Sequence, residues 1–86
     1  MPARVVVYTL NYCPYCYRVK ELLKKRGIAF EEVDLTDNDS LREKIAKKSG
    51  QETAPQVFVN DKAIGGYAEV RRLDEQGLLG KLICGE

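Results

Sequence analysis

The stretch Cys13-Pro14-Tyr15-Cys16-Tyr17 is the most informative part of this chain for both its architecture and its chemistry. It follows an apolar run and opens a segment with helical spacing, so the two cysteines lie one helical turn apart. Their sulfurs can reach disulfide geometry when the first cysteine lies just outside the helix and the second lies in its first turn. Pro14 suits the first helical position, because the N–H that it lacks would be unpaired there. The stretch therefore predicts a redox-active dithiol at a helix N-terminus.

The two thiols are expected to have different roles. Cys13 is predicted to be the N-cap residue, with its sulfur facing the free backbone N–H groups of Tyr15 and Cys16 and the positive end of the helix dipole. Because both effects favour the thiolate, we predict that Cys13 is the nucleophile and is largely ionised at neutral pH. Cys16 is predicted to be more enclosed, to keep its proton longer and to act second, as the resolving thiol. Arg18 and Lys20 are candidates for an additional positive field.

Two other interpretations of the cysteine pair are disfavoured. A zinc site usually takes four Cys or His ligands, whereas this chain has no histidine and only one further cysteine, Cys84. A structural disulfide over so short a loop would remove little entropy from the unfolded chain. We therefore expect no metal. Cys84 is more typical of a small apolar residue near the C-terminus than of a working thiol, and an exposed thiol that becomes glutathionylated or dimerises is the alternative.

Length and composition exclude several classes of protein. A chain of 86 residues suffices for one modest core, and we expect residues 1–86 to form a single domain. A net charge of +1 argues against nucleic-acid partners and anionic membrane surfaces. The sequence shows no signal-peptide or membrane-spanning pattern, and three cysteines are an odd number for a secreted disulfide scaffold. We therefore expect a cytoplasmic protein, and we expect it to be monomeric.

The first half of the chain predicts a strand, a helix and a second strand. Residues 4–10 contain a continuous β-branched and aromatic run, which is typical of a central strand covered on both faces. The helix that begins at the cysteines is expected to end at Gly27, and residues 28–35 alternate as a second strand does. This succession implies a parallel pair of strands with a right-handed crossover.

The second half predicts another helix and a hairpin. The helix is expected to stop at Gly50, and Ser40 and Glu43 have the spacing of a capping box at its start. Residues 56–65 are predicted to form two short strands around an Asn60-Asp61 turn, which makes them antiparallel.

The remaining residues are typical of one or two short helices interrupted at Gly77. The element order is therefore βαβαββα, with a final helix that is either continuous or split. This order predicts an α/β protein in which a mixed four-stranded sheet carries helices on both faces.

Four motifs together resemble the glutaredoxins, the small dithiol members of the thioredoxin-like fold. They are Tyr8-Thr9, Cys13-Pro14-Tyr15-Cys16, Thr53-Ala54-Pro55-Gln56-Val57-Phe58-Val59 and Ile64-Gly65-Gly66. Their order and spacing cover nearly the whole chain. The resemblance implies a glutathione-dependent thiol–disulfide oxidoreductase that reduces protein disulfides and glutathione mixed disulfides.

The resemblance also implies the site residues. The catalytic residues would be Cys13, Pro14, Tyr15 and Cys16. Glutathione would be bound by Thr53, Ala54, Pro55, Gly65, Gly66 and Glu69. In this family the Thr-x-Pro proline is cis and faces the cysteines, the glycine pair approaches the glutamyl end of glutathione, and Glu69 would hold its α-amino group. Four tyrosines are expected to rim the site, namely Tyr12, Tyr15, Tyr17 and Tyr67.

The expected partners are glutathione and disulfide-containing or glutathionylated proteins, with ribonucleotide reductase as a candidate. The chain departs from the family where basic residues are common, since Leu10-Asn11-Tyr12 and Gln51-Glu52 stand there. This departure leaves open a glutaredoxin-like thioredoxin that a flavoprotein reductase reduces. A third hypothesis is a carrier in which two chains hold a [2Fe–2S] cluster through Cys13 and two glutathiones, and Pro14 argues against it.

Overall fold

The computed structural model describes residues 4–11, 13–51 and 53–84, and of Cys84 only the backbone. The helices and strands follow the predicted order, and the final helix is split. They are β1 (Val5–Thr9), α1 (Pro14–Lys25), β2 (Glu31–Asp34), α2 (Asp39–Ser49), β3 (Gln56–Val59), β4 (Lys62–Gly65), α3 (Tyr67–Glu75) and α4 (Leu79–Cys84). Within these residues no helix has both the length and the apolar character that crossing a bilayer requires.

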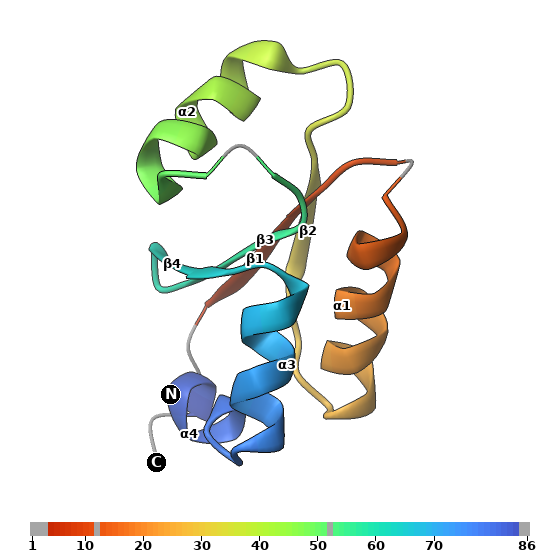
Figure 1. Cartoon of the computed structure of the whole chain (residues 1–86), viewed down its shortest axis with the longest axis vertical. Coiled ribbons are helices and arrows are strands. Elements are labelled where there is room, and N and C mark those ends of the chain that lie inside the picture. Colours follow the sequence, from red (N-terminus) through yellow and green to blue (C-terminus); the bar gives the residue numbers. More distant parts are fainter. Residues whose placement is uncertain (1–3, 12, 52, 85–86) are drawn as a thin grey trace.

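The strands form one mixed sheet in the order β2-β1-β3-β4 (Figure 1). β1 pairs in parallel with β2 and antiparallel with β3, and Val7 has a partner on each side. β3 and β4 form the predicted antiparallel hairpin. Asn60 and Asp61 both have positive φ, at 51° and 67°. The predicted central position of β1, the parallel pair and the Asn60-Asp61 turn are therefore confirmed.

The main core lies between the sheet and helices α1 and α3. Val5 and Val7 of β1 pack with Val19 and Leu23 of α1 and with Val70 of α3. Each of these side chains is at most 2% exposed. Because burying large apolar side chains is the main favourable term in folding, this layer fixes α1, and with it the cysteines, against β1.

The opposite face of the sheet is covered by α2, which lies apart from α1 and α3 (Figure 1). On this face Tyr8 packs edge-on against Phe58, with ring centroids 5.2 Å apart. Lys48 of α2 lies over the Phe58 ring, 5.7 Å from its centroid. Helices on both faces are thus confirmed. The cover is thinner on this face than on the main core, because Val6 and Tyr8 stay half-buried.

β2 is shorter than the predicted strand over residues 28–35. Only Glu31–Asp34 form the strand. Ile28 and Phe30 instead pack against the main core, and Leu35 is buried beyond the other end. The alternation in the sequence therefore records core packing as well as strand pairing, because extended residues bury alternate side chains in either case.

The N-cap of α2 is Asn38, which corrects the predicted capping box at Ser40 and Glu43. The side-chain oxygen of Asn38 accepts a hydrogen bond from the Leu41 N–H at 3.2 Å. We expect Asn38→Ala to lower the free energy of unfolding by about 1 kcal/mol, because the Leu41 N–H in the first turn of α2 loses its hydrogen-bond acceptor. Ser40→Ala is the matched control and should change it by less than about 0.5 kcal/mol. Urea unfolding of both variants measures the difference, and an equal loss from both would contradict this assignment.

Candidate active site

Cys13 and Pro14 begin α1 as the sequence predicts. Cys13 is the N-cap residue in an extended conformation, and proline opens the helix. The Cys13 sulfur does not cap the helix, however. Its thiol donates to the carbonyl oxygen of Ala54, with Sγ 3.5 Å from that oxygen. The prediction that this sulfur faces the helix N–H groups is therefore wrong for the thiol form, because a thiol proton needs an acceptor and a helix N-terminus offers only donors.

Cys16 is buried beneath the start of α1, at 2% exposure. Burial raises the pKa of its thiol to about 12, and the neighbouring Cys13 thiol adds to the increase. The backbone N–H of Leu10, 3.5 Å from the Cys16 sulfur, acts in the opposite direction. The prediction that Cys16 is enclosed is confirmed. The raised pKa agrees in direction with the prediction that Cys16 keeps its proton longer. Cys13, which is half-buried, is the thiol of this pair that an external disulfide can reach more readily.

The segment that faces the thiols is tied to the start of β3. The Ala54-Pro55 peptide bond is cis, as the resemblance implies. Gln56 is 5% exposed, and its Nε2 donates to the carbonyl oxygens of Gln51 at 2.8 Å and Thr53 at 2.9 Å. This role of Gln56 was not predicted from the sequence. The available signal was a polar residue that opens an otherwise apolar strand.

A groove of about 290 Å³ lies where three parts of the chain meet, and it is lined by Ala54, whose carbonyl oxygen accepts the hydrogen bond from Cys13. Cys13 and Cys16 are not themselves lining residues. It is lined by Tyr15, Gln51, Thr53, Ala54, Pro55, Gly66, Tyr67, Ala68 and Glu69. The structure thus brings six predicted site residues to one groove, namely Tyr15, Thr53, Ala54, Pro55, Gly66 and Glu69. Gly65 is not among the lining residues but adjoins them. Pro14 lies exposed in the first turn of α1.

The glycine pair lets β4 and α3 approach the groove closely. Gly66 is the N-cap of α3, and a Cβ atom there would lie 3.1 Å from the Pro55 carbonyl oxygen. Gly65 has a φ of +134°, and a Cβ atom there would lie 2.7 Å from Cγ of Glu69. The observed close contacts are therefore with Pro55 and Glu69. Contact of these glycines with a ligand stays a prediction.

Two of the four predicted rim tyrosines lie together at the groove. The rings of Tyr15 and Tyr67 have centroids 5.9 Å apart. Tyr17 is 63% exposed and lines a neighbouring surface depression along α1 instead. Three residues with sequence-based expectations lie outside the described part of the structure, namely Tyr12, Glu52 and, for its side chain, Cys84.

The groove has one charged residue among its described lining side chains, Glu69. Arg18 stands nearby, with its guanidinium 5.5 Å from the centroid of the Tyr15 ring. Among the described residues, no three His, Cys, Asp or Glu side chains are grouped so that they could hold a metal ion. The groove therefore offers backbone groups, aromatic rings and one carboxylate, which suit a peptide-like ligand with an amino group.

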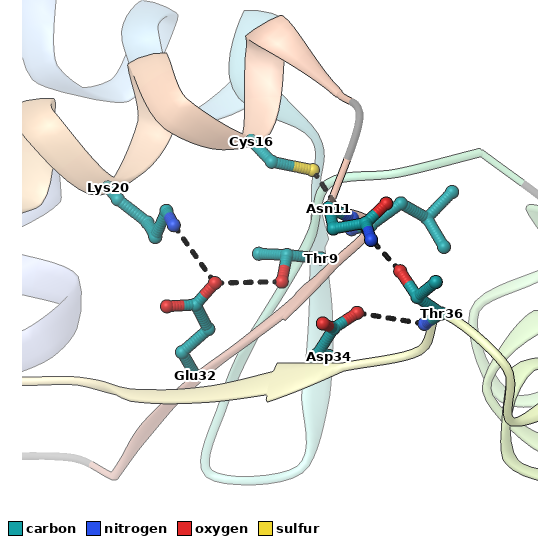
Figure 2. A network of polar contacts seen from close by, with 8 residues as sticks. Thr9, Asn11, Cys16, Lys20, Glu32, Asp34 and Thr36 are labelled. Carbon is teal, nitrogen blue, oxygen red and sulfur yellow. Dashed lines mark hydrogen bonds and ion pairs between the residues drawn. The ribbon is translucent and has the colours of Figure 1, made fainter.

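A second polar cluster lies on the side of α1 that carries Cys16 (Figure 2), and none of its residues lines the groove. Lys20 Nζ is 2.9 Å from Oε2 of Glu32, and the Thr9 hydroxyl donates to the same oxygen at 2.9 Å. The hydrogen bond from Lys20 lowers the pKa of Glu32, so its carboxylate is ionised at neutral pH. Of the two cations considered for the dithiol, Lys20 is thus held by Glu32, one helical turn from Cys16, whereas Arg18 lies over the Tyr15 ring.

Comparison with known proteins gives consistent results. The family model described as Glutaredoxin matches residues 5–64. Glutaredoxin 3 of Escherichia coli K12 is 41% identical over 81 residues, which cover 94% of this chain and 98% of the relative. A glutaredoxin of Pseudomonas aeruginosa is 37% identical over 79 residues, which cover 92% and 94% of the two chains.

Solved structures agree with these relatives. A buckwheat glutaredoxin–glutathione complex superposes with a TM-score of 0.90 at 30% identity, over 96% of this chain and 78% of that one. The holo form of glutaredoxin C1 from Populus tremula x tremuloides gives a TM-score of 0.90 at 36% identity, over 98% and 78% of the two chains.

Proposed function

Since this chain belongs to the glutaredoxin family and is a thiol–disulfide oxidoreductase, we propose that it takes its electrons from glutathione and reduces glutathione mixed disulfides and protein disulfides through Cys13 and Cys16. One observation carries this proposal. The groove is lined by most of the predicted glutathione residues, and one of them, Ala54, has its carbonyl oxygen 3.5 Å from the Cys13 sulfur. A thiol at that position can exchange with a disulfide of a peptide bound along Ala54.

Glutathione is expected to bind as an extended peptide in this groove. Its cysteinyl residue would lie against the backbone of Ala54, which brings its sulfur to Cys13. Its glutamyl end would lie at Gly66, where the Glu69 carboxylate is available for the α-amino group. A charged hydrogen bond of this kind contributes about 1.5 to 3 kcal/mol. Arg18, beside Tyr15, is the nearby candidate for a glutathione carboxylate.

The chemistry begins at the accessible thiol. The Cys13 thiolate attacks a substrate disulfide, forms a mixed disulfide with one sulfur and releases the other as a thiolate, which takes up a proton. In the monothiol route the mixed disulfide carries glutathione, and a second glutathione thiolate attacks it. This step yields oxidised glutathione and restores Cys13. In the dithiol route Cys16 attacks the Cys13 sulfur instead, which releases the reduced substrate and leaves a Cys13–Cys16 disulfide.

Turnover of a small glutathione mixed disulfide tests the proposed electron source. With glutathione, glutathione reductase and NADPH, we expect sustained NADPH oxidation that depends on the protein, because the groove can orient glutathione at Cys13. The matched reaction replaces glutathione and its reductase with a thioredoxin reductase. Turnover only in this second reaction would contradict the proposal and would establish the glutaredoxin-like thioredoxin, which the scarcity of cations in the groove favours.

A further inference from the structure

We propose that Lys20, held in place by Glu32 and Thr9, is a positioning residue for the resolving step, where its charge stabilises the thiolate of Cys16. This inference rests on the dithiol route proposed above and deepens it. In that route Cys16 must lose its proton inside the protein before it can attack. The structure holds a cation, Lys20, one helical turn from Cys16. The first attack, which Cys13 makes, does not require this cation.

The geometry fixes Lys20 on the side of α1 where Cys16 lies. The two residues are four apart on the helix, which puts them on the same face one turn from each other. Glu32 Oε2 binds both the Lys20 ammonium and the Thr9 hydroxyl at 2.9 Å (Figure 2). Thr9 is only 2% exposed, and the Lys20 side chain is 25% exposed. A lysine held in this way cannot swing freely into solvent, so its charge stays near Cys16.

Cys16 needs such a cation because burial opposes its ionisation. Its pKa is raised to about 12, and the charge of Lys20 acts against that increase. The titratable groups on the surrounding elements are Cys13 at the N-cap and Glu32 and Asp34 on β2. The charge of Lys20 lowers the pKa of both Glu32 and Asp34 and so favours their ionised forms. The Leu10 N–H, 3.5 Å from the Cys16 sulfur, lowers the pKa of this thiol more than the charge of Lys20 does.

Glu32 is better suited to holding Lys20 than to accepting the proton of Cys16. Its Oε2 already accepts two hydrogen bonds, and the bond from Lys20 lowers its pKa. A carboxylate stabilised in this way is a weak base. The Cys16 proton is therefore expected to leave to solvent, while Lys20 compensates the negative charge that remains on the sulfur.

The assisted step balances as a thiol–disulfide exchange. The Cys16 thiolate attacks the Cys13 sulfur, and its electron pair forms the Cys13–Cys16 bond. The bond between Cys13 and the substrate sulfur breaks, and the substrate sulfur leaves with the electron pair and takes up a proton from water. Cys16 is thereby oxidised and the substrate sulfur is reduced.

A two-phase release of a coloured aromatic thiolate separates the two thiols in one experiment. The fully reduced chain, with Cys84→Ser in every variant, is mixed with less than one equivalent of a symmetric aromatic disulfide. The first phase reports attack by Cys13, and the second reports attack by Cys16 on the mixed disulfide. A variant that also carries Cys16→Ser should lose only the second phase.

We expect Lys20→Met to slow the second phase about three- to tenfold and to leave the first phase unchanged. If the Cys16 thiolate fraction falls tenfold, the remaining thiolate is more basic and about threefold more nucleophilic, so the net loss of second-phase rate is about threefold. The second phase of Lys20→Met should also reach the rate of the chain that keeps Lys20 only at a pH about half a unit to one unit higher. Lys20→Arg keeps the positive charge and should restore most of the second-phase rate. If Lys20 acted through packing alone, Lys20→Met would instead have the faster second phase of the two variants.

Lys24→Met is the matched control, because Lys24 is exposed on α1 one turn further from the thiols. It changes the net charge equally and should leave both phases unchanged. The inference would be overturned if the second phase of Lys20→Met were as fast as that of Lys24→Met. It would also be overturned if the second phase of Lys20→Arg were as slow as that of Lys20→Met. Absence of the first phase from the unsubstituted chain would instead refute Cys13 as the nucleophile, so the two failures are distinguishable.

Discussion

Replacing Cys13 with serine is expected to lower turnover by at least about a thousandfold with both glutathione mixed disulfides and protein disulfides. A serine hydroxyl is not ionised at neutral pH and cannot form the mixed disulfide on which both routes depend. Cys16 cannot take over, because it is 2% exposed and burial raises its pKa to about 12. The two substitutions are therefore expected to have unequal effects.

Replacing Cys16 with serine should abolish only the dithiol route. A serine hydroxyl fits the buried site and can accept the hydrogen bond that Leu10 now donates to sulfur. Glutathione mixed disulfides should therefore still turn over. A protein substrate should instead stay bound to Cys13 as a mixed disulfide, because Cys16 is not there to release it. Both substrates are assayed with glutathione, glutathione reductase and NADPH, and Cys84→Ser is the matched control. Activity retained by Cys13→Ser would show that another group is the nucleophile.

Replacing Gly65 with alanine is expected to lower the free energy of unfolding by about 2 to 4 kcal/mol. Its φ of +134° is a conformation that residues with a Cβ rarely adopt, and the new Cβ would lie 2.7 to 2.9 Å from three side-chain carbons of Glu69. One of these is the Glu69 Cβ, which cannot move without the backbone of α3. The substitution therefore displaces the carboxylate proposed to bind the amino group of glutathione, and KM for glutathione should rise about tenfold.

Gly80→Ala is the control for this substitution. Gly80 lies in α4, and among the described residues no atom outside its chain neighbours and its own helix backbone lies within 4 Å of the position of its missing Cβ. Its stability should stay the same or increase by up to about 1 kcal/mol, because alanine favours a helix over glycine. Urea unfolding and the glutathione dependence of turnover are measured for both. Equal stability of the two variants would contradict the packing argument, and an unchanged KM in Gly65→Ala would contradict the role of Glu69.

The chain itself determined the features that depend on neighbours within a few residues. Cys13 and Pro14 begin α1 because proline suits a first helical turn. Gly50 ends α2 with a φ of 77°, and Asn60-Asp61 turns the hairpin with two positive φ values. Such choices follow from the local sterics of each residue, so they could be predicted before any fold was known. The resemblance to glutaredoxins extended them to the cis peptide bond at Pro55.

Sequence patterns gave the wrong bounds for a helix start and a strand, because other contacts determine where these elements begin and end. Asn38 and Ser40 both suit an N-cap, and the position of α2 relative to the loop selected Asn38. Ile28 and Phe30 have strand-like alternation but pack on the core beyond the end of β2. A single domain over residues 1–86, a cytoplasmic location and a monomeric state stay predictions.

The surroundings of the two thiols depend on contacts between residues far apart in the sequence. The acceptor of the Cys13 thiol is 41 residues away in the sequence, and Glu32 lies 12 residues from Lys20 and 23 from Thr9. Gln56 holds the segment before β3 through backbone carbonyls, which have no side-chain signature in the sequence. These contacts depend on how α1 and β2 pack against β1, and no pattern of near neighbours encodes that packing. The dithiol could therefore be recognised from the sequence, whereas the partners of each sulfur could not.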